Sequence, residues 1–198
     1  MAAAVWVPDI DKTMAGSTWR FEGTLDVDWE LCPLNASRKF GRESTTKLTY
    51  IERMEALRPY AMQPLDPDFH KKVQRGDFLI GGRGMGYGHD HEHPCVALRG
   101  AGIAAVLCEA TNVNFSRNSI HNGLPVVVVK GIMSAVKTGD RLEVNLVEGW
   151  VKNVTTGKML TFKPWQDFIL DILRKGGLYP WLRKERTSTS EQKSSTGG

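Results

Sequence analysis

The sequence contains few cysteines, and their scarcity argues against two kinds of structure. Its 198 residues include only Cys32, Cys95 and Cys108, which are widely spaced and form no Cys-x-x-Cys pair. Such spacing favours neither a disulfide framework nor an iron–sulfur cluster held by this chain alone. We therefore expect a reducing compartment and no cofactor bound by the chain itself.

Long apolar runs and a strong charge of one sign are also missing. No run approaches the roughly 20 apolar residues that span a bilayer, and residues 1–16 lack the features of a secretory signal or a transit peptide. The net charge is only +4, and the basic residues near the C-terminus are not interleaved with aromatic ones, as a nucleic-acid surface would require. We expect a cytoplasmic protein that binds neither membrane nor nucleic acid.

The length suits a single α/β domain with loosely held ends. Residues 1–16 are predicted to form a flexible extension, residues 17–186 the domain, and residues 187–198, which are rich in Ser, Thr and Gly, a disordered tail. Apolar periodicity and turn residues predict strands at 18–25, 77–81, 103–107, 126–129, 141–146, 150–154 and 158–162, and helices at 50–57, 68–73, 92–100, 114–122 and 165–175.

A glycine-rich segment at residues 84–93 is the most informative part of the chain. It follows an apolar predicted strand, precedes a predicted helix, and places glycines at alternate positions before a run of His, Asp and Glu. Glycines let a backbone approach a ligand closely, and the N–H groups of a helix N-terminus favour a negative charge. The segment therefore predicts a loop over a substrate carboxylate, with a tight turn that only packs as the alternative.

Ordered landmarks along the chain resemble a known family. The chain is similar to the small subunit of 3-isopropylmalate dehydratase, the swivel domain of the aconitase superfamily, over about residues 17–183. The landmarks are Asp66-Pro67-Asp68-Phe69, Gly76-Asp77, Glu92-His93, Ala97-Leu98, Gly102-Ile103, Asn118, Gly123-Leu124-Pro125, Gly139-Asp140, Asn153, Thr155-Thr156-Gly157 and Gly176-Gly177-Leu178.

The resemblance implies both a fold and an activity. The fold would be a swivelling β/β/α domain, with a barrel-like mixed sheet flanked by helices. The activity would be that of a hydro-lyase or isomerase acting on a small hydroxy acid. In such enzymes a large partner subunit carries a four-iron four-sulfur cluster, and the small subunit closes the active site and is inactive alone.

The catalytic letters of the family are replaced here. The family's loop usually reads Gly-x-Gly-Ser-Ser-Arg-Glu-His, in which the first Ser is the base and the Arg grips a carboxylate. Here His89, Asp90 and His91 occupy the Ser-Ser-Arg places. A second family motif, Asp-x-Asp-Thr-Asp-x-Ile-x-Pro, is represented by residues 26–33, with Trp29 and Glu30 in place of its Thr and third Asp.

The replacements suggest roles for the loop residues. His89 could act as the base, because imidazole has an ordinary pKa of about 6.5, or it could be a polar residue of a degenerate site. Asp90 could orient that imidazole, although capping the following helix is favoured for Asp. His91 cannot bind a carboxylate with two parallel hydrogen bonds as Arg does. The predicted catalytic residues are His89, Asp90 and His91, and the predicted substrate-binding residues are Gly86, Gly88, Glu30, Glu92, His93 and Arg117.

Three other interpretations remain open. His89, His91 and His93 would share one face of an extended segment and could hold zinc or iron with Asp90 or Glu92, but no standard metal-binding spacing supports this, and no metal is expected. The chain could also be a specialised-pathway lyase or isomerase with changed chemistry and His89 as base. Finally, it could be a non-catalytic swivel-like binding protein.

Overall fold

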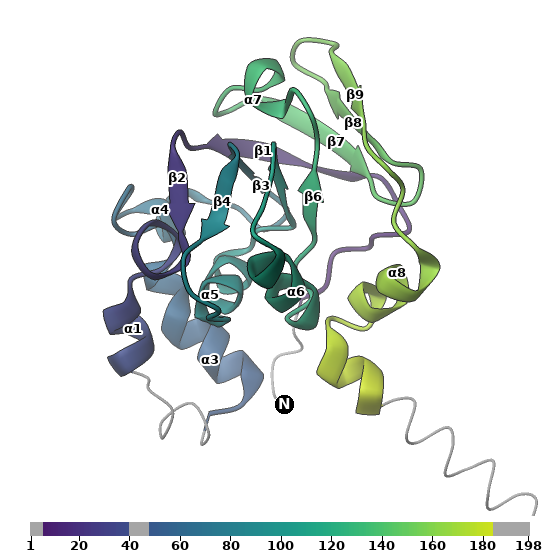
Figure 1. Cartoon of the computed structure of the whole chain (residues 1–198). Helices are drawn as coiled ribbons and strands as arrows, with labels where there is room; N and C mark the ends of the chain where they lie inside the picture. The colour runs from purple at the N-terminus through teal and green to yellow at the C-terminus, as the bar shows by residue number, and fades with distance from the viewer. Residues whose placement is uncertain (1–5, 40–47, 184–198) are drawn as a thin grey trace, which may run out of the picture.

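A mixed seven-stranded sheet lies at the centre of the computed structural model, which describes residues 6–39 and 48–183 (Figure 1). The strand order is β6-β5-β3-β1-β7-β8-β9. The first four strands run parallel, and β1, β7, β8 and β9 pair antiparallel. The strands are β1 (Met14–Arg20), β3 (Phe78–Gly81), β5 (Ala105–Cys108), β6 (Val126–Val128), β7 (Arg141–Asn145), β8 (Trp150–Asn153) and β9 (Met159–Thr161).

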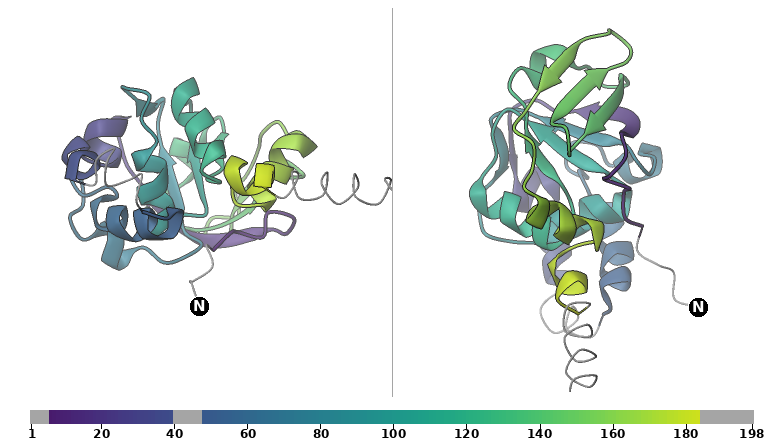
Figure 2. Two further views of the ribbon diagram at one scale, coloured as in Figure 1. Left: turned by 90° about the horizontal axis from the view of Figure 1, so that it is seen from below. Right: turned by 90° about the vertical axis from the view of Figure 1, so that its right-hand side faces the viewer.

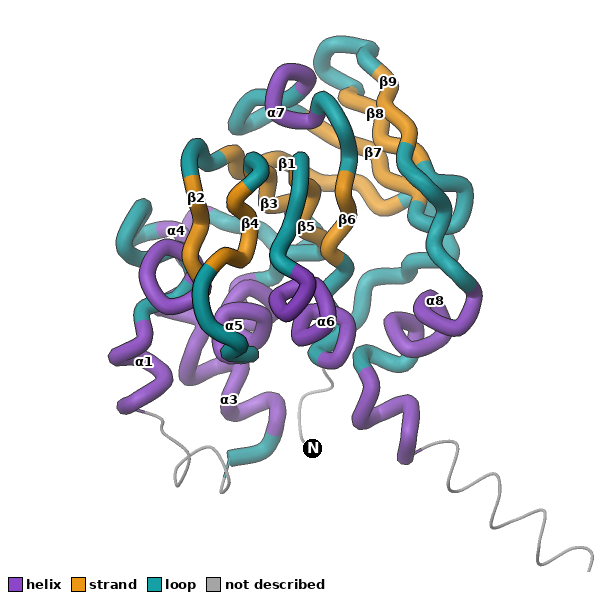
Figure 3. Tube along the Cα trace, in the orientation of Figure 1, coloured by secondary structure: helices purple, strands orange, loops and turns teal. Residues whose placement is uncertain are grey.

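Helices flank this sheet, and Figure 3 distinguishes them from strands and loops. The helix α3 begins with a capping box, in which Thr49 and Glu52 satisfy each other's backbone N–H groups. The helix α5 ends at Gly102, whose φ of 106° suits glycine. The helices are α1 (Leu34–Lys39), α3 (Tyr50–Leu57), α4 (Phe69–Lys72), α5 (His93–Ala101), α6 (Val113–His121), α7 (Ile132–Ala135) and α8 (Asp167–Arg174).

The predicted α/β class and mixed sheet are confirmed. Each of the five predicted helices is present, as are the six predicted strands after residue 76, with ends that differ by a few residues. The predicted hairpin around Thr155-Thr156-Gly157 joins β8 to β9, at the end of the molecule away from α3 (Figure 2). Among the described residues, no helix is long and apolar enough to cross a membrane.

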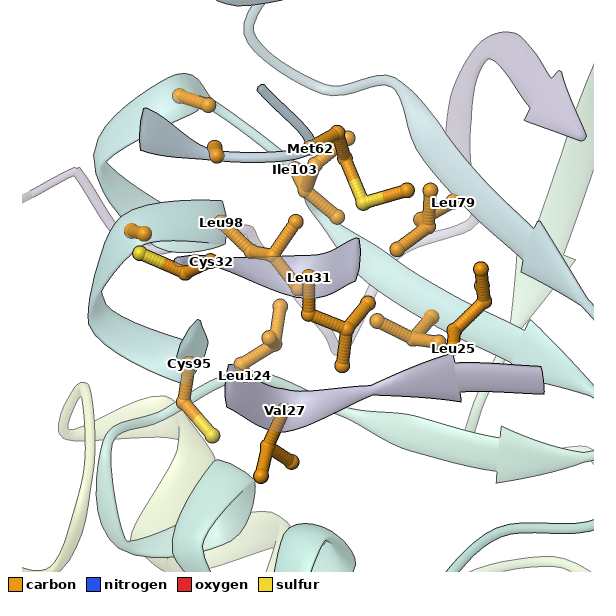
Figure 4. Close-up of a cluster of buried hydrophobic side chains, with 14 of the residues drawn as sticks. Leu25, Val27, Leu31, Cys32, Met62, Leu79, Cys95, Leu98, Ile103 and Leu124 are labelled. Atoms are coloured by element: carbon orange, nitrogen blue, oxygen red, sulfur yellow. The ribbon is translucent and has the colours of Figure 1, made fainter. Parts of the chain in front are cut away.

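The parallel strands bury both of their faces, because alternate side chains point to opposite sides of a sheet. Leu79 of β3 and Val106 of β5 pack into one apolar cluster with α5, part of which is drawn in Figure 4. Phe78 and Ile80 of β3 pack into a second cluster that includes residues of α7 and α8. Helices therefore cover both faces of the parallel half of the sheet.

The N-terminal part of the prediction was wrong in two respects. The strand predicted at 18–25 is two strands, β1 and β2 (Thr24–Asp26), which are separated by a break that includes Gly23 with a φ of 80°. The described part of the predicted flexible extension is packed: β1 begins at Met14, Ile10 is 2% exposed, and the carbonyl of Trp6 accepts a hydrogen bond from Arg99. Residues 1–5 and the predicted tail at 187–198 lie outside the described residues, and the proposed domain boundaries stay a prediction.

A small second sheet positions the candidate site. The strand β2 pairs in parallel with β4 (Gly84–Tyr87), and the two lie side by side in Figure 1. Residues 84–87 were predicted as a loop and are instead a strand. A π-helical turn (Val27–Leu31) follows β2, and the segment 88–92 follows β4. Because parallel strands end at the same edge, this turn and this segment meet there.

Candidate functional site

The carboxylate of Asp28 is the centre of a cluster of imidazoles. Its side chain, on the π-helical turn, is only 3% exposed. Its Oδ2 lies 2.8 Å from Nδ1 of His89, and its Oδ1 lies 2.7 Å from Nδ1 of His91. An ionised carboxylate can only accept hydrogen bonds, so both rings donate from Nδ1. In each neutral ring the Nε2 atom is then the one that can accept a proton.

The end of β2 fixes Asp28 in this position. The Oδ1 atom of Asp26 accepts a hydrogen bond of 2.7 Å from the backbone N–H of Asp28, which caps the turn. The carboxylate of Glu30 in turn accepts a bond of 2.9 Å from the backbone N–H of Asp26. Glu30, predicted to bind substrate, therefore satisfies the backbone at the start of the turn.

The three histidines form a row that leads from the solvent into the protein. The ring centroids of His89 and His91 are 5.6 Å apart, and those of His91 and His93 are 5.8 Å apart. Their side chains are 79%, 44% and 6% exposed, respectively. The shared face expected for alternate residues of an extended segment is therefore present. Only His89 is widely open to an incoming molecule.

His93 and Cys32 form the buried floor of the cluster. The Nε2 atom of His93 donates a hydrogen bond of 3.0 Å to the carbonyl oxygen of Cys32. Burial lowers the pKa of His93 and so favours the neutral form of its ring. Burial also raises the pKa of the Cys32 thiol to about 12, and the negative charge of Asp28 adds to that effect. Cys95 and Cys108 are buried with the same consequence.

Asp90 and Glu92 tie the segment to neighbouring helices. Asp90 was predicted to cap the following helix, and this was wrong: the N-cap position of α5 is Glu92, and no side chain caps it. The Oδ1 atom of Asp90 instead accepts a bond of 2.7 Å from Asn118 on α6. Glu92 accepts a bond of 3.1 Å from Asn122 and lies 3.7 Å from the guanidinium of Arg53 on α3. Both carboxylates therefore anchor the segment.

The glycines of the segment are required by the protein's own packing. Gly86 has a φ of 68°, and a Cβ atom there would lie 2.1 Å from a ring carbon of Phe115. Gly88 has a φ of 98°, and a Cβ atom there would lie 2.4 Å from the carboxylate of Asp26. The space beside each glycine is thus filled by a side chain of this chain. This geometry favours the alternative in which the glycines serve packing.

The structure brings together some of the predicted residues and adds one. His89 and His91 converge on Asp28, which the prediction did not include among the site residues although its motif was noted. Arg117 lies exposed on α6, and within residues 6–39 and 48–183 no ion pair joins it to a carboxylate of the segment. The sequence feature that could have identified Asp28 is the pair of carboxylates at positions 26 and 28. Asp28 and His89 are 61 residues apart in the sequence. Only the pairing of β2 with β4 reveals their contact.

If the chain works with a partner subunit as the resemblance implies, Gly88→Ala is expected to reduce the turnover of that complex by about 100-fold, because a misplacement of about 1 Å in an active site can cost that much. The Cβ atom would displace Asp26 and with it the turn that carries Asp28. Gly139→Ala is the matched control: its φ is 90°, and a Cβ atom there would meet nothing within 4 Å. Both variants pay a backbone cost of about 1–2 kcal/mol. Equal turnover in the two variants, measured by steady-state kinetics, would contradict the role of Gly88.

Comparisons with known proteins support the fold. The protein is a mixed α/β domain in which a small second sheet carries a polar segment at its edge. The 3-isopropylmalate dehydratase structure from Methanocaldococcus jannaschii matches with a TM-score of 0.78 over 91% of this chain and 99% of that chain, at 24% identity, which supports the fold. No protein-family model matches the sequence.

Curated relatives identify the family. The isopropylmalate/citramalate isomerase small subunit of Methanocaldococcus jannaschii is 38% identical over 170 residues, which cover 86% of this chain and 94% of the relative. The 3-isopropylmalate dehydratase small subunit of Pyrobaculum aerophilum is 43% identical over 130 residues, which cover 66% of this chain and 80% of the relative. The chain belongs to the family of 3-isopropylmalate dehydratase small subunits. The resemblance predicted from the sequence is confirmed.

Proposed function

We propose that this chain is the small subunit of a hydro-lyase that removes water from a small hydroxy acid, or adds it back, and that it closes the active site of a large partner subunit. The relatives named above are small subunits of dehydratases or isomerases, and the match covers 94% of the first. Among the described residues, the histidine cluster lies at one edge of the domain, and the side chain of His89 is 79% exposed. That arrangement suits a subunit whose site is completed by a partner.

The contact between His89 and Asp28 carries the chemical part of the proposal. Elimination of water from a hydroxy acid requires a base to remove a proton from carbon. Asp28 holds the Nδ1–H of His89 at 2.8 Å, which leaves Nε2 of a widely exposed ring as the proton acceptor. The buried carboxylate would then stabilise the imidazolium formed when the proton arrives. His89 occupies the place of the family's serine base.

The partner would supply what this chain lacks. A four-iron four-sulfur cluster bound by the large subunit would supply Lewis-acid activation of the departing hydroxyl group. In this chain the cysteines are buried thiols with pKa values raised to about 12, so they are poor cluster ligands. The proposed division places proton removal on this subunit and hydroxyl activation on the other.

The charges around the segment bear on the choice of substrate. His91, in the place of the family's carboxylate-binding Arg, donates its Nδ1–H to Asp28. Five carboxylates lie at the end of β2, on the π-helical turn and on the segment around His91, namely those of Asp26, Asp28, Glu30, Asp90 and Glu92. The positive charge in contact with the segment is the guanidinium of Arg53, which is paired with Glu92. Without a bound cation at this point, a substrate carboxylate would be repelled here. We therefore propose a hydroxy acid that presents fewer carboxylates to this segment than the usual family substrate.

Reconstitution tests the proposed function. The purified chain alone should show no iron–sulfur absorption and no dehydratase activity, and both should appear after co-expression with its large subunit and anaerobic purification. Activity is measured as formation of the unsaturated acid from a panel of hydroxy acids, including isopropylmalate and citramalate. If the chain purified without a partner were brown and contained stoichiometric iron and sulfide, the proposed division of roles between the two subunits would be contradicted. Tight binding of an acid by the complex without turnover would favour the non-catalytic alternative.

A further inference from the structure

We propose that Asp28, His91 and His93 form a binding site for a divalent transition-metal ion such as Zn²⁺. One ligand atom from each of the three side chains lies within 4.8 Å of the other two. The Oδ1 atom of Asp28 is 2.7 Å from Nδ1 of His91 and 3.9 Å from Nε2 of His93. Two imidazoles and one carboxylate form a donor set that proteins use for zinc and for non-haem iron.

The charge balance of the cluster favours a cation. Asp28 is buried, and its ion-pair partners among the described residues are His89, His91 and His93, with neither lysine nor arginine. A buried carboxylate is costly unless a positive charge compensates it. The carboxylate of Asp26, which bonds to the backbone of Asp28, adds further negative charge. A divalent ion would compensate this charge once the three ligand atoms adjust their spacing to it.

The geometry separates the metal ligands from the proposed base. His89 bonds to Oδ2 of Asp28, whereas His91 and His93 face Oδ1. An ion bound at Oδ1 therefore leaves the contact between His89 and Oδ2 in place. At present Nδ1 of His91 donates its proton to Asp28, and Nε2 of His93 donates its proton to the carbonyl of Cys32. A bound ion would take the place of these two protons. Each ring would then carry its proton on the other nitrogen or release it to solvent.

The side chain of His91 makes the site accessible. It is 44% exposed, whereas Asp28 and His93 are almost fully buried. An ion would therefore be enclosed by Asp28 and His93 and would enter from the solvent past His91. Binding would also connect the π-helical turn to the segment 88–92, since Asp28 belongs to the first and His91 to the second. We expect it to raise the melting temperature of the chain.

Cobalt titration tests the site without any need for activity. The untagged, full-length chain is treated with a chelator, dialysed and titrated with Co²⁺. We expect one equivalent to bind with visible d–d absorption bands, and Zn²⁺ to displace it. His91→Ala should weaken Co²⁺ binding by about 100-fold or more, because changes even to the outer partners of a metal site cost about 10- to 100-fold. The exposure of His91 makes this variant the one best suited to fold normally, which its melting temperature verifies.

Two further variants separate this proposal from the proposed function and from surface binding. His70→Ala removes an imidazole on α4 and should leave Co²⁺ affinity unchanged. His89→Ala should change Co²⁺ affinity by only a few-fold, although it removes the proposed base, so the two proposals can fail independently. Absence of saturable Co²⁺ binding by the unmodified chain would overturn the metal site. So would equal affinity in His91→Ala and the unmodified chain, or equal losses in His70→Ala and His91→Ala.

Discussion

His89→Ala is expected to lower the turnover number of the reconstituted complex by about 100-fold or more, which is the usual scale of a general base. The side chain of His89 is 79% exposed, and it donates a hydrogen bond to Asp28, whose carboxylate also accepts one from His91. Its removal should therefore change the melting temperature little. Steady-state kinetics on the complex give the turnover number, and thermal unfolding of the chain checks the fold.

The matched control for this prediction is His70→Ala, which removes an imidazole from α4. Its turnover number should equal that of the unmodified complex. The Michaelis constant helps to interpret the result: loss of a base lowers the turnover number, whereas loss of uniform substrate binding raises the Michaelis constant alone. Unchanged kinetics in His89→Ala would remove His89 from the mechanism and favour the interpretation of the chain as a binding subunit.

The sequence predicted most of the fold, because its signals are local. The alternation of polar and apolar residues in residues 141–146 predicted β7, and Thr155-Thr156-Gly157 predicted the β8–β9 hairpin. Gly102 marked the end of α5 through its backbone conformation. In each case the structure depends on residues close in sequence, so a short window of sequence suffices.

The candidate site was predicted less completely, because its contacts are distant in sequence. The glycines at 86 and 88 suggested a ligand, but the atoms beside them belong to Phe115 and Asp26. Asp90 suggested a helix cap, but Asn118 on α6 holds its carboxylate. Neither contact has a local signal. The contact of His89 with Asp28 similarly depends on the parallel pairing of β2 with β4.

A buried arginine connects this site to the rest of the domain. Arg99 on α5 is 4% exposed, and its guanidinium donates to the carbonyls of Asn122, Gly176 and Trp6 at 2.6, 3.0 and 2.7 Å. Burial lowers the pKa of Arg99. The side chain of Asn122 also donates to Glu92 in the candidate site. The guanidinium thus joins the N-terminal segment, the end of α6 and the segment that follows α8.

Arg99→Met should lower the free energy of unfolding by about 3 kcal/mol, because the carbonyls of Gly176 and Trp6 would lose their donor and a carbonyl left without one costs about 1–3 kcal/mol. The carbonyl of Asn122 keeps the hydroxyl of Tyr50 as a donor. For a chain of this size the melting temperature should fall by about 6–12 °C. Methionine keeps much of the length and the apolar stem of arginine, so the loss reports the guanidinium rather than a cavity.

Two variants complete the Arg99 experiment. Arg99→Lys should be intermediate, since an ammonium keeps the charge but cannot reproduce the fork that reaches three carbonyls. Arg117→Met, on the exposed face of α6, should stay within about 0.5 kcal/mol of the unmodified chain, as is usual for surface positions. Chemical denaturation of all three variants measures these differences. If Arg99→Met and Arg117→Met unfolded at the same denaturant concentration, the three carbonyls would be satisfied without the guanidinium, and its role in joining the N-terminal segment to α6 and the segment that follows α8 would be wrong.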